Sequence, residues 1–325
     1  MANLRIDLDG DKANSAISVS VKNFSSGVSG FELGLSGIQA SGTMDIFKLP
    51  SSNWFSSIGF ESQRLKVSAV DFTLVGANVP VDGLMLGQVK VGGLNSFAPV
   101  TLDYLSLVAN DKSNTKTSTL TSNLNYDVNI SGGWGFKLLD SEGANNYTGS
   151  SGTDTVIFNG KKSAYAINAQ SAMTFQVVKS GVTDVLKDID RLSFTDVSTA
   201  YDLNSSAGTV AKIIGSVFGK DSLSNKNYVG IGLYFMDAGW SYENLGSLAV
   251  QAAGALTNDQ IVTLLWSNVI GTQPTDSDKA PYVELLKNGM PPGQLVRLAS
   301  DSSFNTVKID LAGLTQSGID YLPLT

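Results

Sequence analysis

Alternation of apolar and polar residues dominates the first 130 positions of the chain. Ile17, Val19 and Val21 are separated by polar residues, and the same period of two recurs at residues 31–35. Successive side chains of a strand point to opposite faces, so each run predicts a strand with one apolar face. Because the runs are short and separated by Ser and Gly turns, we predict an antiparallel β-sandwich over residues 1–138.

The middle of the chain changes composition twice. Residues 110–125 are rich in Ser, Thr, Asn and Lys, and they form either a long hairpin loop or an interdomain linker. A segment rich in Gly, Asp and Asn follows, and it leads into short apolar runs around Val156 and Val177. This composition is typical of tight turns between short strands, so we assign residues 139–202 to a short β segment.

After residue 202 the apolar period becomes helical. Val210, Ile213 and Val217 recur at the spacing of one helix face, and residues 245–252 and 261–269 repeat that spacing. We therefore predict a helical bundle over residues 203–325, and a multi-domain β plus α architecture for the whole chain. The expected N-caps are Ser241 and Thr257, and the expected helix ends lie at Gly219, Gly271 and Gly289.

Composition narrows the possible functions. Hydrophobic residues make up 42% of the 325 residues and charged residues 16%, which is the balance of a folded protein. The chain has no Cys and no His, which excludes disulfides, thiolate nucleophiles, the Ser-His-Asp triad and His- or Cys-based zinc sites. A net charge of -7 without a basic run argues against nucleic-acid binding. No apolar run has the length of a membrane span, and no N-terminal signal peptide is visible.

A glycine-rich motif before Val156 is the first candidate metal site. Gly149, Gly152 and Asp154 fit the calcium nonapeptide G-G-x-G-x-D-x-U, with Ser150 in place of the second Gly. The glycines permit a tight turn, the Asp offers a carboxylate to a hard cation, and the apolar residue begins a strand. A glycine-rich loop before a strand, without any metal, explains the same residues equally well.

A degraded copy of this motif lies nine residues earlier. There Gly143 takes the place of Gly152, Asn145 that of Asp154, and Tyr147 that of Val156. Since successive turns normally share a bound ion, we add Gly143 and Asn145 to the candidate calcium ligands. The second candidate site is an acidic stretch near the N-terminus, formed by Asp7, Asp9 and Asp11.

Those N-terminal carboxylates occur at alternate positions, as at the start of an EF-hand loop. The Gly expected after the third acid is Lys12, and no Glu stands at the twelfth position, which is Ser18. The motif also lies among predicted strands. A calcium site in a strand-connecting loop and a solvated acidic turn both remain open.

Two stretches after residue 150 resemble the strand segment that follows the calcium repeats in bacterial RTX proteins. The resemblance implies calcium binding outside the cell and export by a type I ABC transporter with an uncleaved C-terminal signal. The near loss of the repeat array departs from the family and weakens the expectation of strong calcium dependence. The matching residues are Gly152, Asp154, Val156, Phe158 and Gly160, then Asp184, Leu186, Ile189, Arg191, Leu192 and Phe194.

The predicted helical part resembles the DUF4214-type helical repeats that are common in the same proteins. The stretch AGTVAKIIGSVFGK, residues 207–220, recurs in looser form as NDQIVTLLWSNVIGTQP, residues 258–274. The N-terminal half weakly resembles cohesin-type and carbohydrate-binding β-sandwiches, through a strand–turn–strand pattern over residues 23–33. That last pattern is common to many sandwiches.

These observations predict a secreted or cell-surface protein without catalytic activity. We expect calcium binding and self-assembly, as a homo-oligomer or polymer, into a surface layer (S-layer), filament or biofilm matrix. The alternative is a secreted adhesin or binding module that recognises a glycan or a surface protein. A hydrolase with paired carboxylates is the least favoured, because the sequence places no two acids at a defined separation.

Overall fold

The computed structural model divides into two compact units, Met1–Asp196 and Val197–Thr325. It describes residues 135–140, 143–254 and 257–324 throughout. Before residue 133 it describes the strands of the first unit and a few of their side chains. Sequence patterns predicted three segments, whereas the strands before residue 139 and the β segment after it lie in one compact unit.

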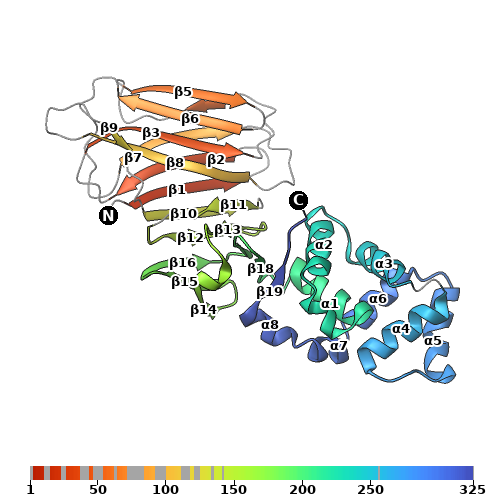
Figure 1. Ribbon diagram of the computed structural model, residues 1–325. Coiled ribbons are helices and arrows are strands. Elements are labelled where there is room, and N and C mark those ends of the chain that lie inside the picture. Colours follow the sequence, from red (N-terminus) through yellow and green to blue (C-terminus); the bar gives the residue numbers. More distant parts are fainter. Residues whose placement is uncertain are drawn as a thin grey trace. The chain divides into compact units, whose positions relative to one another are not determined.

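Strands account for nearly all of the described first unit (Figure 1). The alternating runs at residues 17–21 and 31–35 lie in the strands Ser15–Lys22 and Gly27–Ser36. Their bounds are β1 Asn3–Gly10, β2 Ser15–Lys22, β3 Gly27–Ser36, β4 Met44–Ile46, β5 Trp54–Glu61, β6 Arg64–Asp71, β7 Leu84–Val91, β8 Val100–Asn110, β9 Ser118–Leu120, β10 Asn125–Gly132, β11 Phe136–Leu139, β12 Asn146–Thr148, β13 Thr155–Ile157, β14 Ala166–Ser171, β15 Thr174–Lys179, β16 Val182–Lys187 and β17 Arg191–Ser193, with a short 3-10 helix η1 at Lys162–Ala164.

The strands of this unit form two sheets. Sheet A has the order β14-β15-β16-β12-β10-β1-β2-β7-β4, and sheet B has the order β17-β13-β11-β8-β3-β6-β5, with β9 paired to β8. Strands β1 to β9 pair with one another in antiparallel fashion, as predicted. Strand β9, which lies within the polar stretch at residues 110–125, pairs with β8 in antiparallel fashion.

From β10 onward the pairing becomes parallel and the chain forms a two-sheet coil, here called the β-roll. The chain alternates between the sheets, from β10 to β11, β12 and β13, and later from β16 to β17 (Figure 1). In sheet B, Leu138 pairs with Val156 and Val156 pairs with Leu192, so equivalent positions lie 18 and 36 residues apart. Eighteen residues equal two nonapeptides, so one complete turn of the coil in sheet B has the length of two nine-residue repeats.

A hairpin interrupts the β-roll before its last turn. Strand β15 pairs with β14 on one side and with β16 on the other, both in antiparallel fashion, which extends sheet A. Beside this hairpin, Phe158 stacks on Phe194 with ring centroids 5.2 Å apart. Tyr165 packs against both rings, with its centroid 5.0 Å from that of Phe158 and 5.3 Å from that of Phe194. These rings cover the interior of the last turn with apolar surface.

The described residues of the second unit, 197–254 and 257–324, form eight α-helices and one short strand pair. Strands β18 and β19 form an antiparallel pair that joins the two ends of this unit, and Ile319 of β19 is buried. The bounds are β18 Ser198–Ala200, α1 Ser206–Phe218, η2 Lys220–Ser224, α2 Lys226–Asp237, α3 Tyr242–Ala252, α4 Asn258–Ile270, α5 Asp276–Lys287, α6 Pro292–Ser300, α7 Ser303–Lys308, α8 Leu311–Ser317 and β19 Ile319–Tyr321.

Helices α1–α3 and α4–α6 are two copies of one three-helix arrangement. Helices α1 and α4 both have 13 residues, and each ends at a glycine with positive φ, Gly219 or Gly271. Helices α2 and α5 both have 12 residues, and Gly239 and Gly289, 50 residues apart, follow them with the same backbone hydrogen bonds. The stretch at residues 207–220 and the stretch from residue 258 thus each form a 13-residue helix that ends at a glycine with positive φ.

The caps predicted from sequence are confirmed. The Ser241 side chain accepts a hydrogen bond from the Asn244 amide at the start of α3, and Thr257 forms a capping box with Gln260 at the start of α4. Gly289, which has positive φ, follows Asn288, the C-cap of α5. Each of these positions ends or begins a helix because it satisfies a backbone group that the helix itself leaves unpaired.

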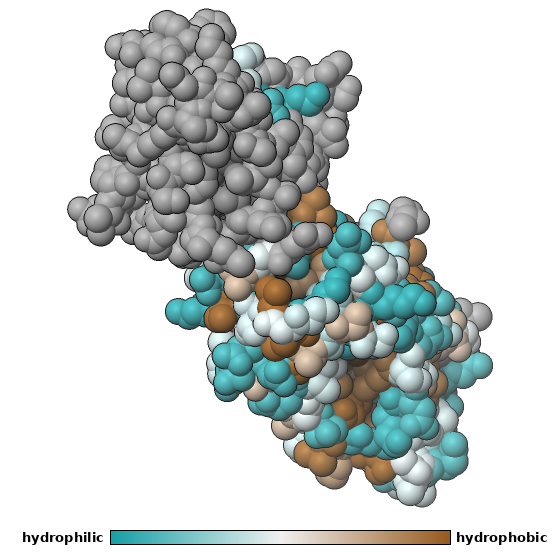
Figure 2. Space-filling model, turned by 60° about the vertical axis from the view of Figure 1, so that its left-hand side comes forward, coloured by the Kyte–Doolittle hydropathy of each residue, from teal (hydrophilic) through white to brown (hydrophobic). Residues whose placement is uncertain are grey.

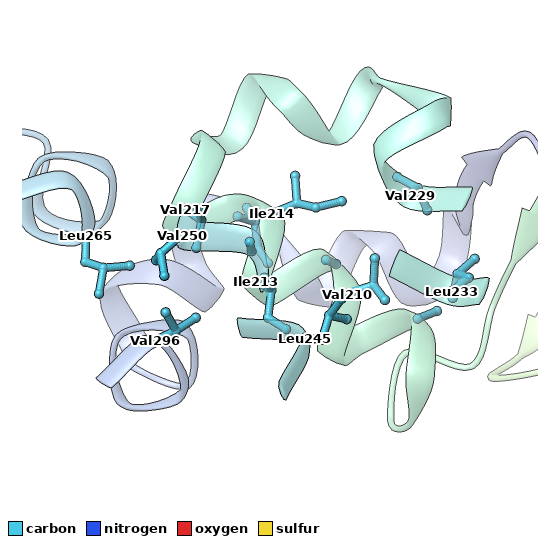
Figure 3. Close-up of a cluster of buried hydrophobic side chains, with 14 of the residues drawn as sticks. Val210, Ile213, Ile214, Val217, Val229, Leu233, Leu245, Val250, Leu265 and Val296 are labelled. Atoms are coloured by element: carbon cyan, nitrogen blue, oxygen red, sulfur yellow. The ribbon is translucent and has the colours of Figure 1, made fainter. Parts of the chain in front are cut away.

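Helix α1 runs through the centre of the second unit. Val210, Ile213 and Val217 point from it into a cluster with Leu233 of α2 and Val296 of α6 (Figure 3). Helices α3 and α6 approach closely where glycines replace larger residues: a Cβ on Gly246 would lie 3.0 Å from Val296, and one on Gly293 would overlap the Glu243 carbonyl oxygen. This crossing joins the two three-helix copies.

Candidate functional site at the corners of the β-roll

Four polar residues occupy one recurring position in the β-roll, here called the corner position. Each stands two residues before an inward-facing apolar residue: Asn145 before Tyr147, Asp154 before Val156, Asp184 before Leu186 and Asp190 before Leu192. Asn145, Asp154 and Asp184 are themselves buried. Buried carboxylates need hydrogen-bond partners, so their contacts decide what the corner positions do.

One hydrogen bond repeats along the corners of both sheets. The backbone N–H of a corner residue in one turn donates to the carboxylate in the corner position of a later turn. This bond runs from Phe136 to Asp154 at 2.9 Å, from Asp154 to Asp190 at 2.8 Å, and from Asn145 to Asp184 at 2.9 Å. We call this series the corner ladder. Because the acceptors are carboxylates, its bonds are stronger than those between neutral groups.

Asp154 connects three turns of the roll. Its Oδ1 accepts from the Phe136 amide, and its Oδ2 accepts from the Ser150 amide at 2.6 Å and from the Ser150 hydroxyl at 3.3 Å. Its own carbonyl oxygen accepts from the amides of Asp190 and Arg191. Ser150, which departs from the nonapeptide pattern, therefore supplies a hydroxyl donor that glycine could not.

The corner in sheet A brings two carboxylates to one amide. The Nδ2 of Asn145 donates to Asp184 at 2.9 Å, to Asp140 at 3.0 Å and to the Gly143 carbonyl at 2.8 Å. The Tyr147 hydroxyl donates to the same Asp140 oxygen at 3.1 Å. The amide and the hydroxyl hold two acidic groups close together at a buried position.

Burial raises the pKa of each of these acids. The pKa of Asp154 rises to about 6, and hydrogen bonds from Ser150 and Phe136 limit that rise. The pKa of Asp184 also rises to about 6 through burial. Burial raises the pKa of Asp140 to about 7, with a further contribution from the nearby charge of Asp184. All three therefore take up protons more readily than exposed aspartates do.

The predicted calcium ligands fall into two groups on different sheets. Gly149, Gly152 and Asp154 lie at the corner that leads into sheet B, while Gly143 and Asn145 lie at the corner that leads into sheet A. Each group bonds to the later turn that stacks on it. Only glycine fits at position 149, because a Cβ would overlap the Asp188 carbonyl oxygen and lie 2.8 Å from Asp154 Oδ2.

Sequence reasoning missed Asp140 and Asp190 and did not assign Asp184 to the site. The signal for Asp184 and Asp190 was present, since both precede an apolar strand residue by two positions, as Asp154 does. The inserted hairpin conceals this signal, because it places Asp190 36 residues after Asp154, in place of the 18 residues that separate the preceding turns of sheet B. Asp140 follows β11 and carries no comparable pattern.

The N-terminal acidic stretch lies elsewhere. Asp7 and Asp9 are in β1, paired to β10 and β2, and not in a loop between strands. Asp11 lies outside the described residues. Across the parts of the chain that the structure describes, no three acidic side chains are grouped so that they could hold a metal ion. Calcium binding stays a prediction at both places.

The surface of the second unit is mixed in character. Apolar residues alternate with hydrophilic ones across the described surface in Figure 2. Phe304 and Val307 of α7 are 64% and 77% exposed, and Leu298 of α6 is 57% exposed. Phe304 and Val307 are three residues apart on α7, so they are neighbours on one face of that helix. No described helix is long and apolar enough to cross a membrane.

Comparison with known proteins finds likeness at the level of structure. No family model matches the chain, and no curated protein does. Similar solved structures include the second type II cohesin module of the ScaA scaffoldin of Acetivibrio cellulolyticus, at 9% identity and a TM-score of 0.29, over 39% of this chain and 92% of that chain.

Two further cohesins show the same level of likeness. The sixth cohesin of scaffoldin B from Acetivibrio cellulolyticus has 18% identity and a TM-score of 0.28, over 38% of this chain and 93% of that chain. A non-cellulosomal cohesin from the archaeon Archaeoglobus fulgidus has 15% identity and a TM-score of 0.25, over 39% of this chain and 88% of that chain. The cohesin-like pattern noted in the sequence thus has structural counterparts, at scores that carry no argument about a partner.

Proposed function

We propose that this chain is a non-catalytic extracellular binding protein, in which the strands before residue 133 recognise a partner and the β-roll supports them. The observation that carries this proposal is the corner ladder. Asp154 and Asp184, buried acids of the roll, are engaged as acceptors for backbone amides and stabilise the coil. The β10–β12 and β8–β11 pairs connect the roll to the N-terminal strands, so that both sheets continue through it. The roll therefore supports these strands.

The partner on this proposal is a glycan or a protein on a cell surface. Labelled full-length chain can be titrated onto intact bacterial cells, onto cells shaved with protease and onto cells oxidised with periodate. Saturable binding that protease removes identifies a protein partner, and binding that periodate removes identifies a glycan. Absence of saturable binding to every preparation, with the chain folded, would contradict the proposal.

Calcium-dependent ordering of the β-roll is the second candidate, and it rests on the 18-residue turn. That period equals two nonapeptides, and Asp154 occupies the motif's acidic position. A calcium ion at this corner would replace the Ser150 and Phe136 amides as the partners of the carboxylate. Melting the chain in calcium chloride and in excess chelator tests this, since a ligand of the folded state raises its melting temperature. Identical melts would rule it out.

Export by a type I transporter and assembly into a layer, filament or matrix rest on the family resemblance. Co-expression with a type I transporter and its accessory proteins tests the first. The chain should reach the medium only when the transporter is active. Recovery of the chain from cells alone, in both cultures, would contradict export by this route.

A further inference from the structure

Strand β14 ends sheet A within the first unit. It pairs with β15 on one side, and no other described strand of the unit lies on its second side. An edge strand presents a row of backbone donors and acceptors that fits another extended chain. Natural edges often carry Lys or another charge that prevents such pairing, whereas β14 reads AINAQS and is uncharged throughout.

The exposure pattern of β14 is symmetric about Asn168. Ala166, Asn168 and Gln170 are exposed, while Ile167 and Ala169 between them are half-buried. An antiparallel pair with its dyad at Asn168 would place Ile167 opposite Ala169 of a second copy, and Ala166 opposite Gln170. Exposed residues would then face exposed ones, and half-buried residues half-buried ones. A slip by one residue would mix the two faces, whereas a slip by two would keep them matched. Of the matched registers, the one with its dyad at Asn168 pairs all five residues from Ala166 to Gln170.

We propose that β14 pairs with β14 of a second copy of this chain, antiparallel and centred on Asn168. Such a contact uses the same surface of both copies and therefore closes as a dimer. It joins two A sheets edge to edge. The inference goes beyond the proposed recognition of a partner, because it uses neither the N-terminal strands nor the corner ladder.

Two features limit the length of this contact. The register of β14 against β15 shifts between Ala169 and Ser171, and bulges of this kind protect edges. The side-chain Nε2 of Gln170 also donates to the backbone carbonyl oxygen of Asn168, at 3.5 Å, which is the long limit of a hydrogen bond. The bulge lies beyond Ala169, so the three central cross-strand pairs remain regular. We expect a weak dimer that depends on concentration.

Sedimentation velocity of the full chain over a range of concentrations tests the proposal. Asn168→Lys and Asn168→Asp each place like charges directly opposite one another across the dyad, so each variant alone should be monomeric where the natural chain dimerises. An equimolar mixture of the two should dimerise again, because each pair then has opposite charges. Asn168 is exposed, and circular-dichroism melts should show that both variants fold.

Gln176→Lys is the matched control. Gln176 is exposed and pairs with Asn168 from β15, one strand inward from the edge. The substitution adds the same charge beside the edge but not at the dimer contact, so the dimer should stay intact. A natural chain that is monomeric at every concentration would overturn the proposal. A Gln176→Lys variant that loses the dimer as fully as Asn168→Lys, or a charge-swapped mixture that stays monomeric, would also overturn it.

Discussion

The backbone amide of Asp154 donates a 2.8 Å hydrogen bond to Oδ2 of Asp190, 36 residues later. The two residues hold the same position in stacked turns of the β-roll, and Asp154 offers its own carboxylate to Phe136 of the preceding turn. Asp154 therefore bonds to both neighbouring turns, through its carboxylate to the preceding turn and through its backbone amide to the following one. The corner ladder gives the acidic residues at this position a structural role within the coil.

Removing the carboxylate at the centre of the ladder should destabilise the first unit. Asp154→Ala leaves the amides of Phe136 and Ser150 without their acceptor at a buried position, and each unpaired buried group costs about 1–3 kcal/mol. We expect the unit to lose about 3 kcal/mol of unfolding free energy in urea, at the scale of two such groups. The second unit should melt as before.

Asp196→Ala is the control for that variant. Asp196 accepts a bond of the same kind from the Lys162 amide, at 2.9 Å, but in an exposed setting where water can replace it. Its loss should cost less than about 1 kcal/mol. Equal losses in the two variants would show that burial of the corner carboxylate contributes nothing.

Much of this architecture follows from sequence pattern, and the exceptions have physical causes. Alternation predicted the strands and helical spacing predicted α1, α3 and α4, because these patterns depend on local geometry alone. The parallel stacking of the roll was not predictable in the same way, since it joins residues such as Val156 and Leu192 across an inserted hairpin. Asp140 joins the site only through contacts made in the folded state.

The stability of the first unit should fall as pH rises from about 5 to 8. The pKa values of Asp154 and Asp184 rise from 3.8 to about 6, and that of Asp140 to about 7, so the folded chain binds these protons more tightly than the unfolded chain does. The stabilisation is fully present below pH 3.8 and is lost as pH rises through 6 to 7. Thermal melts across this range measure it.

The Asp140→Asn variant tests the part of this pH dependence that lies above pH 6. It removes the group with the highest pKa, so most of the fall between pH 6 and 8 should disappear, while Asp154 and Asp184 still produce a fall between pH 4 and 6. A first unit that becomes more stable on going from pH 5 to pH 8 would show that the folded state does not raise these pKa values.

The second unit should depend on the close approach of α3 and α6. Gly293→Ala would drive a methyl group into the Glu243 carbonyl oxygen, and the side chain of Ser247 also lies within 2.6 Å of that methyl position. The neighbouring atoms include backbone, so the two helices must separate, and overpacking of this kind costs about 1–3 kcal/mol. Gln251→Ala, on the exposed side of α3, is the control and should have little effect. Urea unfolding followed by helical circular dichroism measures both.

The short pairing of β18 with β19 should stabilise the whole second unit, because it closes the unit at its two ends. Ile319 is 3% exposed and packs in the core cluster that includes Val210, while Thr199 donates a 2.8 Å hydrogen bond to Asp320 across the strand pair. Ile319→Ala removes buried apolar contacts and should cost about 2–5 kcal/mol, the range for such truncations in cores. Leu324→Ala is the comparison, since Leu324 is 50% exposed and should cost far less. If both truncations lower the midpoint of helix unfolding equally, the strand pair does not close the unit.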